Sequence, residues 1–372
     1  MLAHRVPAVR PVLAFLLALV LVTPPALLRG NNMLVLMMVL VLAAAVVGLV
    51  MPRLALRGVS VRRLLPRHGR VGESMRIRYS VSRTKRHWIP AFSVGIDERL
   101  EGPAVDVEQT AWILHVAPGD TVHGDLHLRP LGRGRLMLAG ARLGTSFPFG
   151  LHRSQHVVGG RREIVVHPQI HPVPSSILRA ARGTGLDGPR SGRHRGQGEE
   201  WFGTRPARAG DRLRDIAWRI SAHQDTLIAL ERTRPQPPRM QIVLDLRLPT
   251  DELDEPDFDT ARHLEETSIE LTASLVQAGY DAGDEVGLRV MGLSVGPHHP
   301  RRGSLHLDRM LTTLALLDLD GPREPERRRG GVRSGVVVVQ PDRIRPLAGL
   351  GDVLHLSARN WPPGAGQRAI EP

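Results

Sequence analysis

The chain has 372 residues and no cysteine, so it holds no disulfide framework, thiolate nucleophile or Cys-ligated zinc ion. Its formal net charge is +13, but Lys85 is the only lysine and aromatic residues make up only 3% of the chain. Few side chains are therefore available to stack on bases, and we expect no nucleic-acid partner. The length allows a membrane anchor and about two soluble domains.

Two uncharged apolar runs lie near the N-terminus. The first, PVLAFLLALVLVTPPALL, lies between Arg10 and Arg29, and the second, MLVLMMVLVLAAAVVGLVM, extends from Met33 to Met51. Each approaches the ~20 residues that a helix needs to cross a ~30 Å hydrocarbon core. We predict a transmembrane hairpin in the lipid bilayer over residues 1–54, with helices at about 11–28 and 33–51. Two prolines at 24 and 25 are expected to end the first helix near the interface, before a polar turn at 29–32.

The charges around these runs predict the orientation. A signal peptide is the competing interpretation of the first run, which Arg5 and Arg10 precede, but its apolar stretch is long and an A-x-A cleavage site is missing. Six arginines follow the second run before the first acid, Glu73: Arg53, Arg57, Arg62, Arg63, Arg67 and Arg70. Because positive charge collects on the cytoplasmic side, we expect a multi-pass protein of the cell membrane with a cytoplasmic body.

Residues 55–160 have the pattern of a β-sandwich. Five short runs of roughly alternating polarity, separated by Gly, Pro and Asp, lie at 76–82, 91–97, 111–117, 121–130 and 135–144. This spacing is typical of an antiparallel sandwich of the immunoglobulin-like class. We expect it to act as a spacer or docking module.

Residues 161–236 are interpreted as a linker followed by a distinctive segment. One more strand is predicted at 163–167, after which Pro168, Pro172 and Pro174 interrupt the chain. The stretch RGTGLDGPRSGRHRGQGEE (182–200) lacks the spacing of a phosphate-binding loop, and we predict a flexible loop.

Residues 237–372 alternate between strands and helices. Continuous apolar runs predict strands at 240–246, 285–291, 335–340 and 352–357, and helical spacing predicts helices at 259–278 and 304–317. This order indicates an α/β domain with a mostly parallel sheet.

The segment GTRPARAGDRLRDIAWRISAHQDTLIALERTRPQ (203–236) resembles the signature of the family catalogued as domain of unknown function 58, roughly G-L-R-x-Y-x-x-G-D-x-x-R-x-I-x-W-x-x-S-A-R and then L-x-V-R-E. The earlier SFPFGL (146–151) resembles the family's Y-P-F-G-L-F, and the N-terminal helices and final sheet match its layout. Ala207 replaces the usual Tyr, and His223 an Arg that is often found. The matching positions are Gly203, Arg205, Gly210, Asp211, Arg214, Ile216, Trp218, Ser221 and Ala222, with Leu227 and Glu231 after them.

Local chemistry suggests how this segment folds. Gly210 and Asp211 are typical of a turn in which Asp211 caps a short helix. Ile216, Trp218 and Ile220 alternate as in a strand, with Trp218 as an anchor against the sheet. Forked ion pairs are expected from Arg205 and Arg214 to Asp211, Asp215 or Glu231. Two interpretations remain open: the arginines fix a domain junction, or they present a docking surface.

The resemblance implies that the last domain is similar to a von Willebrand factor A domain. Such domains bind Mg²⁺ through D-x-S-x-S after the first strand, together with a Thr and an Asp from later loops. Here Asp245 is present, but Arg247 and Pro249 replace the two hydroxyl residues, so we expect no metal at this degenerate position. The acids that follow, Asp251, Glu252, Asp254, Glu255, Asp257 and Asp259, are expected to form a solvated loop.

The sequence offers no catalytic motif. His298 and His299 lie in a predicted loop without H-E-x-x-H, and the serines lack G-x-S-x-G. We therefore predict no catalytic residue and no cofactor.

The resemblance further implies association with MoxR-type AAA+ ATPases. We expect a non-enzymatic membrane-anchored adaptor or assembly platform that serves complex assembly or the cell envelope. Two alternatives stay open: a divalent-cation-dependent ligand-binding protein, and a membrane-associated hydrolase with an unrecognised site.

Overall fold

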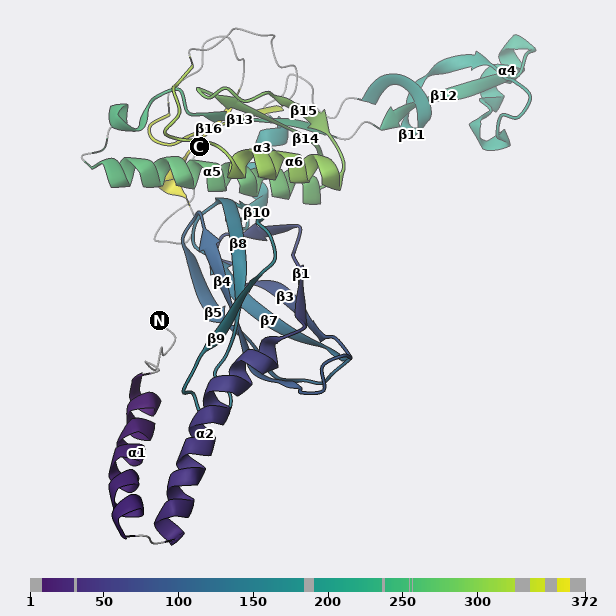
Figure 1. The fold of residues 1–372 in the computed structure, drawn as a ribbon. Helices are drawn as coiled ribbons and strands as arrows, with labels where there is room; N and C mark the ends of the chain where they lie inside the picture. The colour runs from purple at the N-terminus through teal and green to yellow at the C-terminus, as the bar shows by residue number, and fades with distance from the viewer. Residues whose placement is uncertain are drawn as a thin grey trace. The chain divides into compact units, whose positions relative to one another are not determined.

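The computed structural model describes residues 9–29, 32–183, 191–235, 238–253, 255, 257–324, 335–344 and 353–361. The chain divides into two compact units, Met1–His167 and Pro168–Pro372, which follow one another in the colour gradient of Figure 1.

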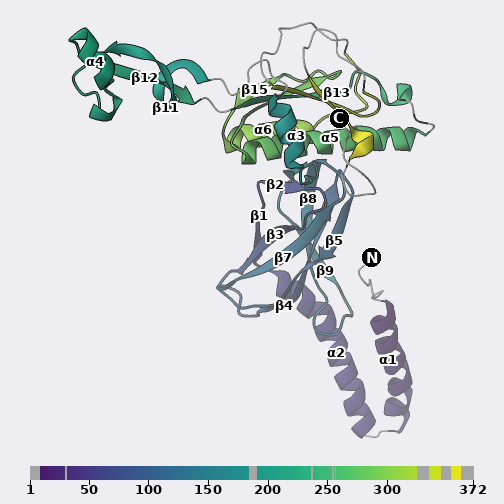
Figure 2. The ribbon, with the colours of Figure 1, turned by 180° about the vertical axis from the view of Figure 1, so that it is seen from behind.

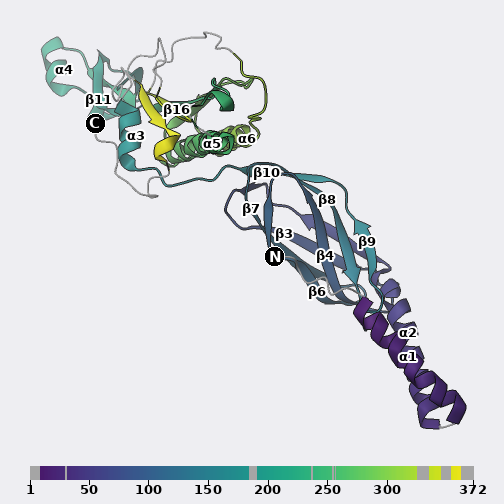
Figure 3. The same ribbon diagram turned by 90° about the vertical axis from the view of Figure 1, so that its left-hand side faces the viewer.

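The first unit begins with two helices in contact, α1 (Val9–Arg29) and α2 (Asn32–Leu56) (Figure 3). Within the described residues, α2 has the length and hydropathy to cross a membrane, so it can anchor the chain or act as a signal; the apolar run of α1, Val12–Leu28, is shorter. Helix α1 does not end at Pro24 and Pro25, as we predicted, but continues to Arg29 although each proline removes a backbone hydrogen-bond donor. Likewise α2 continues through Pro52. Residues 30 and 31 of the expected turn lie outside the described residues.

Two sheets form the β-rich sandwich of the first unit. One has the strand order β1 (Val59–Leu64), β3 (Met75–Arg83), β7 (Thr121–Pro130), β5 (Val105–Gln109). The other has the order β2 (His68–Arg70), β10 (Arg162–His167), β8 (Gly134–Thr145), β4 (Ala91–Glu101), β6 (Ala111–Val116), with β9 (Ser154–Val158) on β8.

Alternation explains the sandwich core, because every second residue of a strand faces inward. In β3 the inward positions are Met75, Ile77, Tyr79 and Val81, all buried. The domain boundary expected at residue 160 lies instead after His167, since β10 pairs with both β8 and β2 of the sandwich.

The second unit contains a mixed α/β sheet with the order β15 (His298–Arg301), β14 (Glu285–Met291), β13 (Arg239–Asp245), β16 (Gly335–Gln340), β17 (Leu354–Ser357). Neighbouring strands are parallel except β15, which runs antiparallel to β14. The predicted strands and the mostly parallel sheet are confirmed. His298 and His299, expected in a loop, instead begin this edge strand.

Helices α5 (Phe258–Asp281), α6 (Ser304–Ala315) and α3 (Ser175–Gly183) share one hydrophobic core with this sheet (Figure 2). Ile242 and Leu244 of β13 lie in that core with Ile269 of α5, all fully buried. The prolines at 168, 172 and 174 led us to miss α3.

The chain leaves β13 for β14 on one side and returns to β16 on the other. The carboxyl ends of β13 and β16 therefore form a topological switch point, where parallel sheets open a crevice.

Between α3 and β13 the chain forms a hairpin of β11 (Ser191–Pro206) and β12 (Ile228–Pro235), joined by a 3-10 turn (Leu213–Asp215) and α4 (Trp218–Gln224). We call residues 203–230 the arm. The predicted loop at 182–200 is thus partly a strand, and residues 184–190 lie outside the described residues. The predicted strand at 216–220 is wrong beyond Ile216, which bridges to Ala229. The next residues turn into a helix in which the Ala217 carbonyl accepts the Ser221 amide at 2.9 Å.

Candidate functional site

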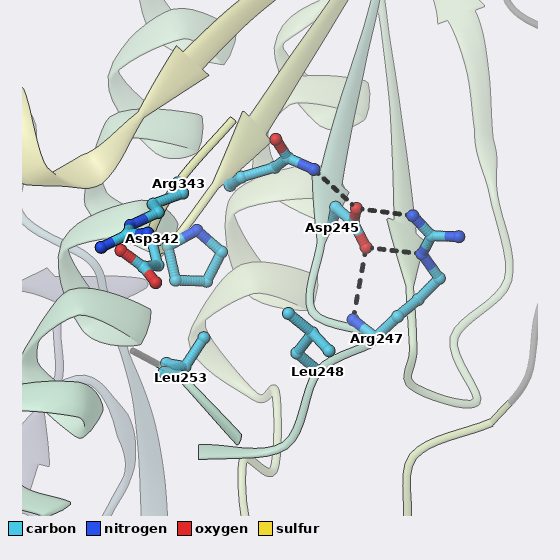
Figure 4. Close-up of a pocket in the computed structure, with 8 residues that line it drawn as sticks. Asp245, Arg247, Leu248, Leu253, Asp342 and Arg343 are labelled. Carbon is cyan, nitrogen blue, oxygen red and sulfur yellow. Dashed lines mark hydrogen bonds and ion pairs between the residues drawn. The ribbon is translucent and has the colours of Figure 1, made fainter. Parts of the chain in front are cut away.

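A cavity of about 280 Å³ lies at the switch point of the second sheet. Asp245 ends β13 and Gln340 ends β16, so the two strands bring both side chains to the cavity wall; Figure 4 shows Asp245 beside Arg247 there. The lining consists of Asp245, Arg247, Leu248, Leu253, Gln340, Pro341, Asp342 and Arg343. The polar residues that follow the apolar runs of these two parallel strands therefore line the crevice.

Both carboxylate oxygens of Asp245 are already bound. Arg247 donates from Nε to Oδ1 at 2.8 Å and from Nη2 to Oδ2 at 2.9 Å, and Gln340 Nε2 donates to Oδ2 at 3.0 Å. Burial alone would raise the pKa of Asp245, but these hydrogen bonds outweigh it and hold the pKa below its usual range. The carboxylate is therefore ionised and neutralised by Arg247, one of the two residues that stand where a metal site would have hydroxyl ligands.

A second ionic group holds Asp342, which lines the crevice. Arg359 donates from Nε to Asp342, which is 4% exposed, and its Nη2 lies 2.5 Å from Glu255 Oε1. The Ser357 hydroxyl donates to the Asp342 carbonyl at 2.6 Å. Glu255 was expected in a solvated loop, but its side chain is only 11% exposed because Arg359 binds it. Within the described ranges, no cluster of three or more His, Asp or Glu side chains is arranged to hold a metal ion.

The loop from Asp245 to Leu253 is tied to the helices behind it by Glu265 of α5. This carboxylate is fully buried and accepts from Thr250 at 2.8 Å and from Arg323 Nη2 at 2.6 Å. Burial raises the pKa of Glu265 above its usual range, although the hydrogen bond from Thr250 and the charges of Arg323 and Arg262 oppose the rise. The crevice is therefore built on a fixed base.

A forked ion pair organises the arm. Arg205 donates from Nη1 and Nη2 to the two oxygens of Asp211 at 2.8 and 2.7 Å, which confirms this predicted pair. The Arg208 amide also donates to Asp211, at 2.7 Å. The Arg205 hydrogen bonds and then the Arg208 amide lower the pKa of Asp211 to about 2. Asp211 therefore stabilises the turn that precedes it, in which Gly210 has a φ of 100°. The prediction that Asp211 caps a short helix is wrong, because it does not cap the following 3-10 turn.

Other signature residues hold the arm together from within. Ile216 is buried, and the Ser221 hydroxyl accepts the Ile228 amide at 2.9 Å. Gly203 lies opposite Glu231 across the hairpin; the Glu231 side chain is outside the described part of the structure. These contacts explain the hydroxyl at position 221 and the aliphatic side chain at position 216.

Two signature residues face outward instead. Trp218 is 58% exposed, so the prediction that it anchors against the sheet is wrong: the α4 helix turns it to the surface. Arg214 is exposed and, among the side chains that the structure describes, makes no hydrogen bond or ion pair. Large apolar neighbours on the arm are exposed as well, namely Leu213, Ile220 and Leu227.

Sequence reasoning missed two crevice residues, Gln340 and Asp342, and also Arg359, which binds Asp342. Gln340 and Asp342 carried a usable signal, because they lie one and three residues after the apolar run of a parallel strand. Arg359 carried none, since it reaches Asp342 from a turn 17 residues further along the chain.

Comparison with known proteins identifies a family. No curated protein matches the chain. Solved structures with partial similarity include trypsin-activated alpha-2-macroglobulin from Escherichia coli, 17% identical with TM-score 0.24 over 30% of this chain and 7% of that one. A CARDB domain from Pyrococcus furiosus is 14% identical with TM-score 0.22, over 29% of this chain and 94% of that one. Residues 203–346, from the start of the arm to beyond β16, match the family described as protein of unknown function DUF58, and the chain therefore carries a domain of this family.

Proposed function

We propose that the chain is a non-enzymatic, membrane-anchored adaptor that docks a partner protein on its arm. The observation that carries this proposal is the exposure of Leu213 (75%), Trp218 (58%) and Leu227 (57%) on a segment that the Arg205–Asp211 fork stabilises. Clustered apolar side chains on a folded surface mark interaction sites, and Trp and Arg are the residues that most often dominate binding energy.

The charges of the arm suit an acidic partner surface. Four exposed arginines lie on the arm with the exposed apolar residues. Arg205 neutralises Asp211, which leaves Asp215 and Asp225 as the other acids among the described side chains of the arm. Opposite charge on a partner would speed association and fix its orientation. The arginines are Arg208, Arg212, Arg214 and Arg219.

The anchor in this proposal is the α1–α2 hairpin. The uncharged run of α2 and the excess of arginine after it favour insertion with the body on the cytoplasmic side of the cell membrane. A cytoplasmic body is where an ATP-driven partner would work. From the family resemblance, the partner we propose is a MoxR-type AAA+ ATPase, in complex assembly or cell-envelope function.

The finer fold that we propose for the second sheet is von Willebrand factor A-like. Its first strand lies in the middle of a parallel sheet and ends in Asp245, at the switch point. Because Arg247 neutralises that carboxylate, docking in this proposal does not depend on a divalent cation.

The test is a pull-down of the tagged full chain from native membranes in mild detergent, with and without ATP. We expect an AAA+ ATPase to be recovered with the wild type and lost with Arg214→Ala and Trp218→Ala. Arg301→Ala, which removes an exposed arginine on β15, is the matched control and should retain the partner. Failure to recover any ATPase under crosslinking would sink the proposal.

One observation favours a second candidate, cation-dependent ligand binding. The crevice is open and holds two buried carboxylates, Asp245 and Asp342. Calorimetric titration of the full chain with Mg²⁺ and Ca²⁺ tests it: stoichiometric binding by the wild type would favour this candidate over the adaptor.

A further inference from the structure

Four loops gather at the end of the sandwich that receives α2. The start of β1 at Val59 lies opposite Arg83, the last residue of β3, and β7 begins beside it at Thr121. In the other sheet, β4 begins opposite the end of β6, and β8 ends where β9 begins. The turns at 57–58, 84–90, 117–120 and 146–153 therefore share this end.

The α2 helix is fixed to this end of the sandwich. Arg83, 3% exposed, donates to the carbonyls of Ala55 and Leu54 in the last turn of α2, the latter at 3.3 Å. The amide of Thr84 donates to the Gly58 carbonyl at 3.2 Å. The depth of these loops in a bilayer thus follows from their position along α2.

The turn at 146–151 reaches the apolar part of the helices. A Cβ on Gly48 would lie 2.6 Å from Leu151 Cδ1, so Leu151 packs directly on α2 at this point. The Phe149 ring lies 5.9 Å from the Phe15 ring of α1. Since Gly48 precedes Met51 by three residues, this contact lies about 4.5 Å inside the uncharged run, at about 1.5 Å per helical residue.

The four loops at this end carry more basic than acidic residues. They carry Arg57, Lys85, Arg86 and Arg153, while Asp120 is their only acid by sequence. Lys85, Arg86 and Arg153 are exposed and form no ion pair with the described side chains. Trp88 stands among them with 86% of its surface exposed. Tryptophan beside lysine and arginine is the composition found at the membrane–water interface.

We propose that this end of the sandwich, the basic rim (Arg57, Lys85, Arg86, Trp88, Phe149 and Arg153), binds anionic phospholipid headgroups. The proposal rests on membrane anchoring by α1 and α2. Phe149 lies at the edge of the hydrocarbon, the Trp88 ring lies among the headgroups, and the cations face the negatively charged leaflet. Lipid binding would hold the sandwich, together with the α2 helix that is fixed to it, at one tilt relative to the membrane plane.

The test uses the absence of cysteine from the chain. Full-length Trp88→Cys is spin-labelled and placed in nanodiscs of phosphatidylcholine, with or without phosphatidylglycerol. Accessibility to oxygen, which partitions into lipid, is compared with accessibility to a neutral nickel chelate, which stays in water. We expect nickel accessibility at residue 88 to fall when anionic lipid is present, and the additional changes Lys85→Glu and Arg86→Glu to abolish this fall.

Two labelled controls separate the possible outcomes. Leu131→Cys, at the opposite end of the sandwich and 58% exposed, should stay accessible to nickel in both lipids. Leu40→Cys replaces a residue of α2 that is 60% exposed, and its label should be accessible to oxygen and shielded from nickel. If residue 40 is embedded in lipid but residue 88 is equally accessible to nickel in both lipids, the basic rim does not bind anionic lipid, and the anchor still stands. A water-exposed residue 40 would overturn the anchor itself, and the rim with it.

Discussion

The Arg247 guanidinium holds both carboxylate oxygens of Asp245, two residues before it, at 2.8 and 2.9 Å. In a D-x-S-x-S magnesium site, a hydroxyl oxygen would stand at position 247. Here the guanidinium of Arg247 supplies a positive charge instead. We therefore expect these two residues to decide whether the crevice can bind a metal ion.

Removing the cation should expose this latent site. We expect Arg247→Ser to leave the buried Asp245 carboxylate with Gln340 and the backbone amide of residue 247 as its donors and without a balancing charge, which destabilises the domain by up to about 3–5 kcal/mol. Mg²⁺ at millimolar concentration should raise the melting temperature of this variant and leave the wild type unchanged, as measured by thermal unfolding in detergent.

The matched control is the double variant Arg247→Ser with Asp245→Asn, which should lose the Mg²⁺ effect. If the wild type shows the same Mg²⁺-dependent rise, Arg247 does not block the site and the adaptor's independence of cations is wrong.

Glu265 should be a main support of the crevice loop. It accepts from Thr250, Arg262 and Arg323 and is fully buried. Glu265→Ala removes the partner of the nearly buried Arg323, so we expect a loss of about 3–5 kcal/mol. Glu252→Ala, at an exposed position in the same loop, should leave the melting temperature within error. Equal melting temperatures for both variants would contradict this role.

The strands of the second sheet could be predicted well because continuous apolar runs bounded by polar residues have few alternatives. The predicted bounds of β14 and β16 agree with the structure. Short alternating segments are ambiguous: Ile216, Trp218 and Ile220 fit a strand by sequence, but hydrogen bonds from Ser221 to Ala217 and from Ile228 to Ser221 favour a helical turn. The glycine- and arginine-rich β11 pairs through its backbone, which composition does not reveal.

The candidate site was predictable to a similar extent. Asp245 and Arg247 lie two residues apart, so the presence of opposite charges at this position could be read from the sequence. Gln340 joins them from 95 residues further along the chain, because the strand order places β16 beside β13. This contact depends on the strand order of the sheet, which no local sequence pattern reveals.

The contact between Gly48 and Leu151 gives a test of how α2 is fixed to the sandwich. Gly48→Val would force a side chain into the space that Leu151 occupies, and overpacking of this kind costs about 1–3 kcal/mol. We expect a lower melting temperature in nanodiscs and faster proteolysis at 146–153. Ala43→Val, on the exposed side of the same helix, is the control; a similar effect of both changes would show that the damage lies in the helix itself.

The arm should lose its fold in acid. Hydrogen bonds from Arg205 and Arg208 lower the pKa of Asp211 to about 2, whereas an unfolded Asp titrates near ~3.9. Because the folded pKa is the lower one, Asp211 stabilises the arm fully above pH ~3.9 and loses this contribution as the pH falls toward about 2. Pepsin is active throughout this window and should cleave the arm faster as the pH falls, once its own change in activity with pH is corrected with a denatured standard.

Asp211→Asn cannot form the ion pair with Arg205, so its arm should be cleaved readily at pH ~4.5 and show little further change with acid. If wild type and variant follow the same pH profile, the fork does not stabilise the arm, and the exposed Trp218 is then not presented on a rigid surface.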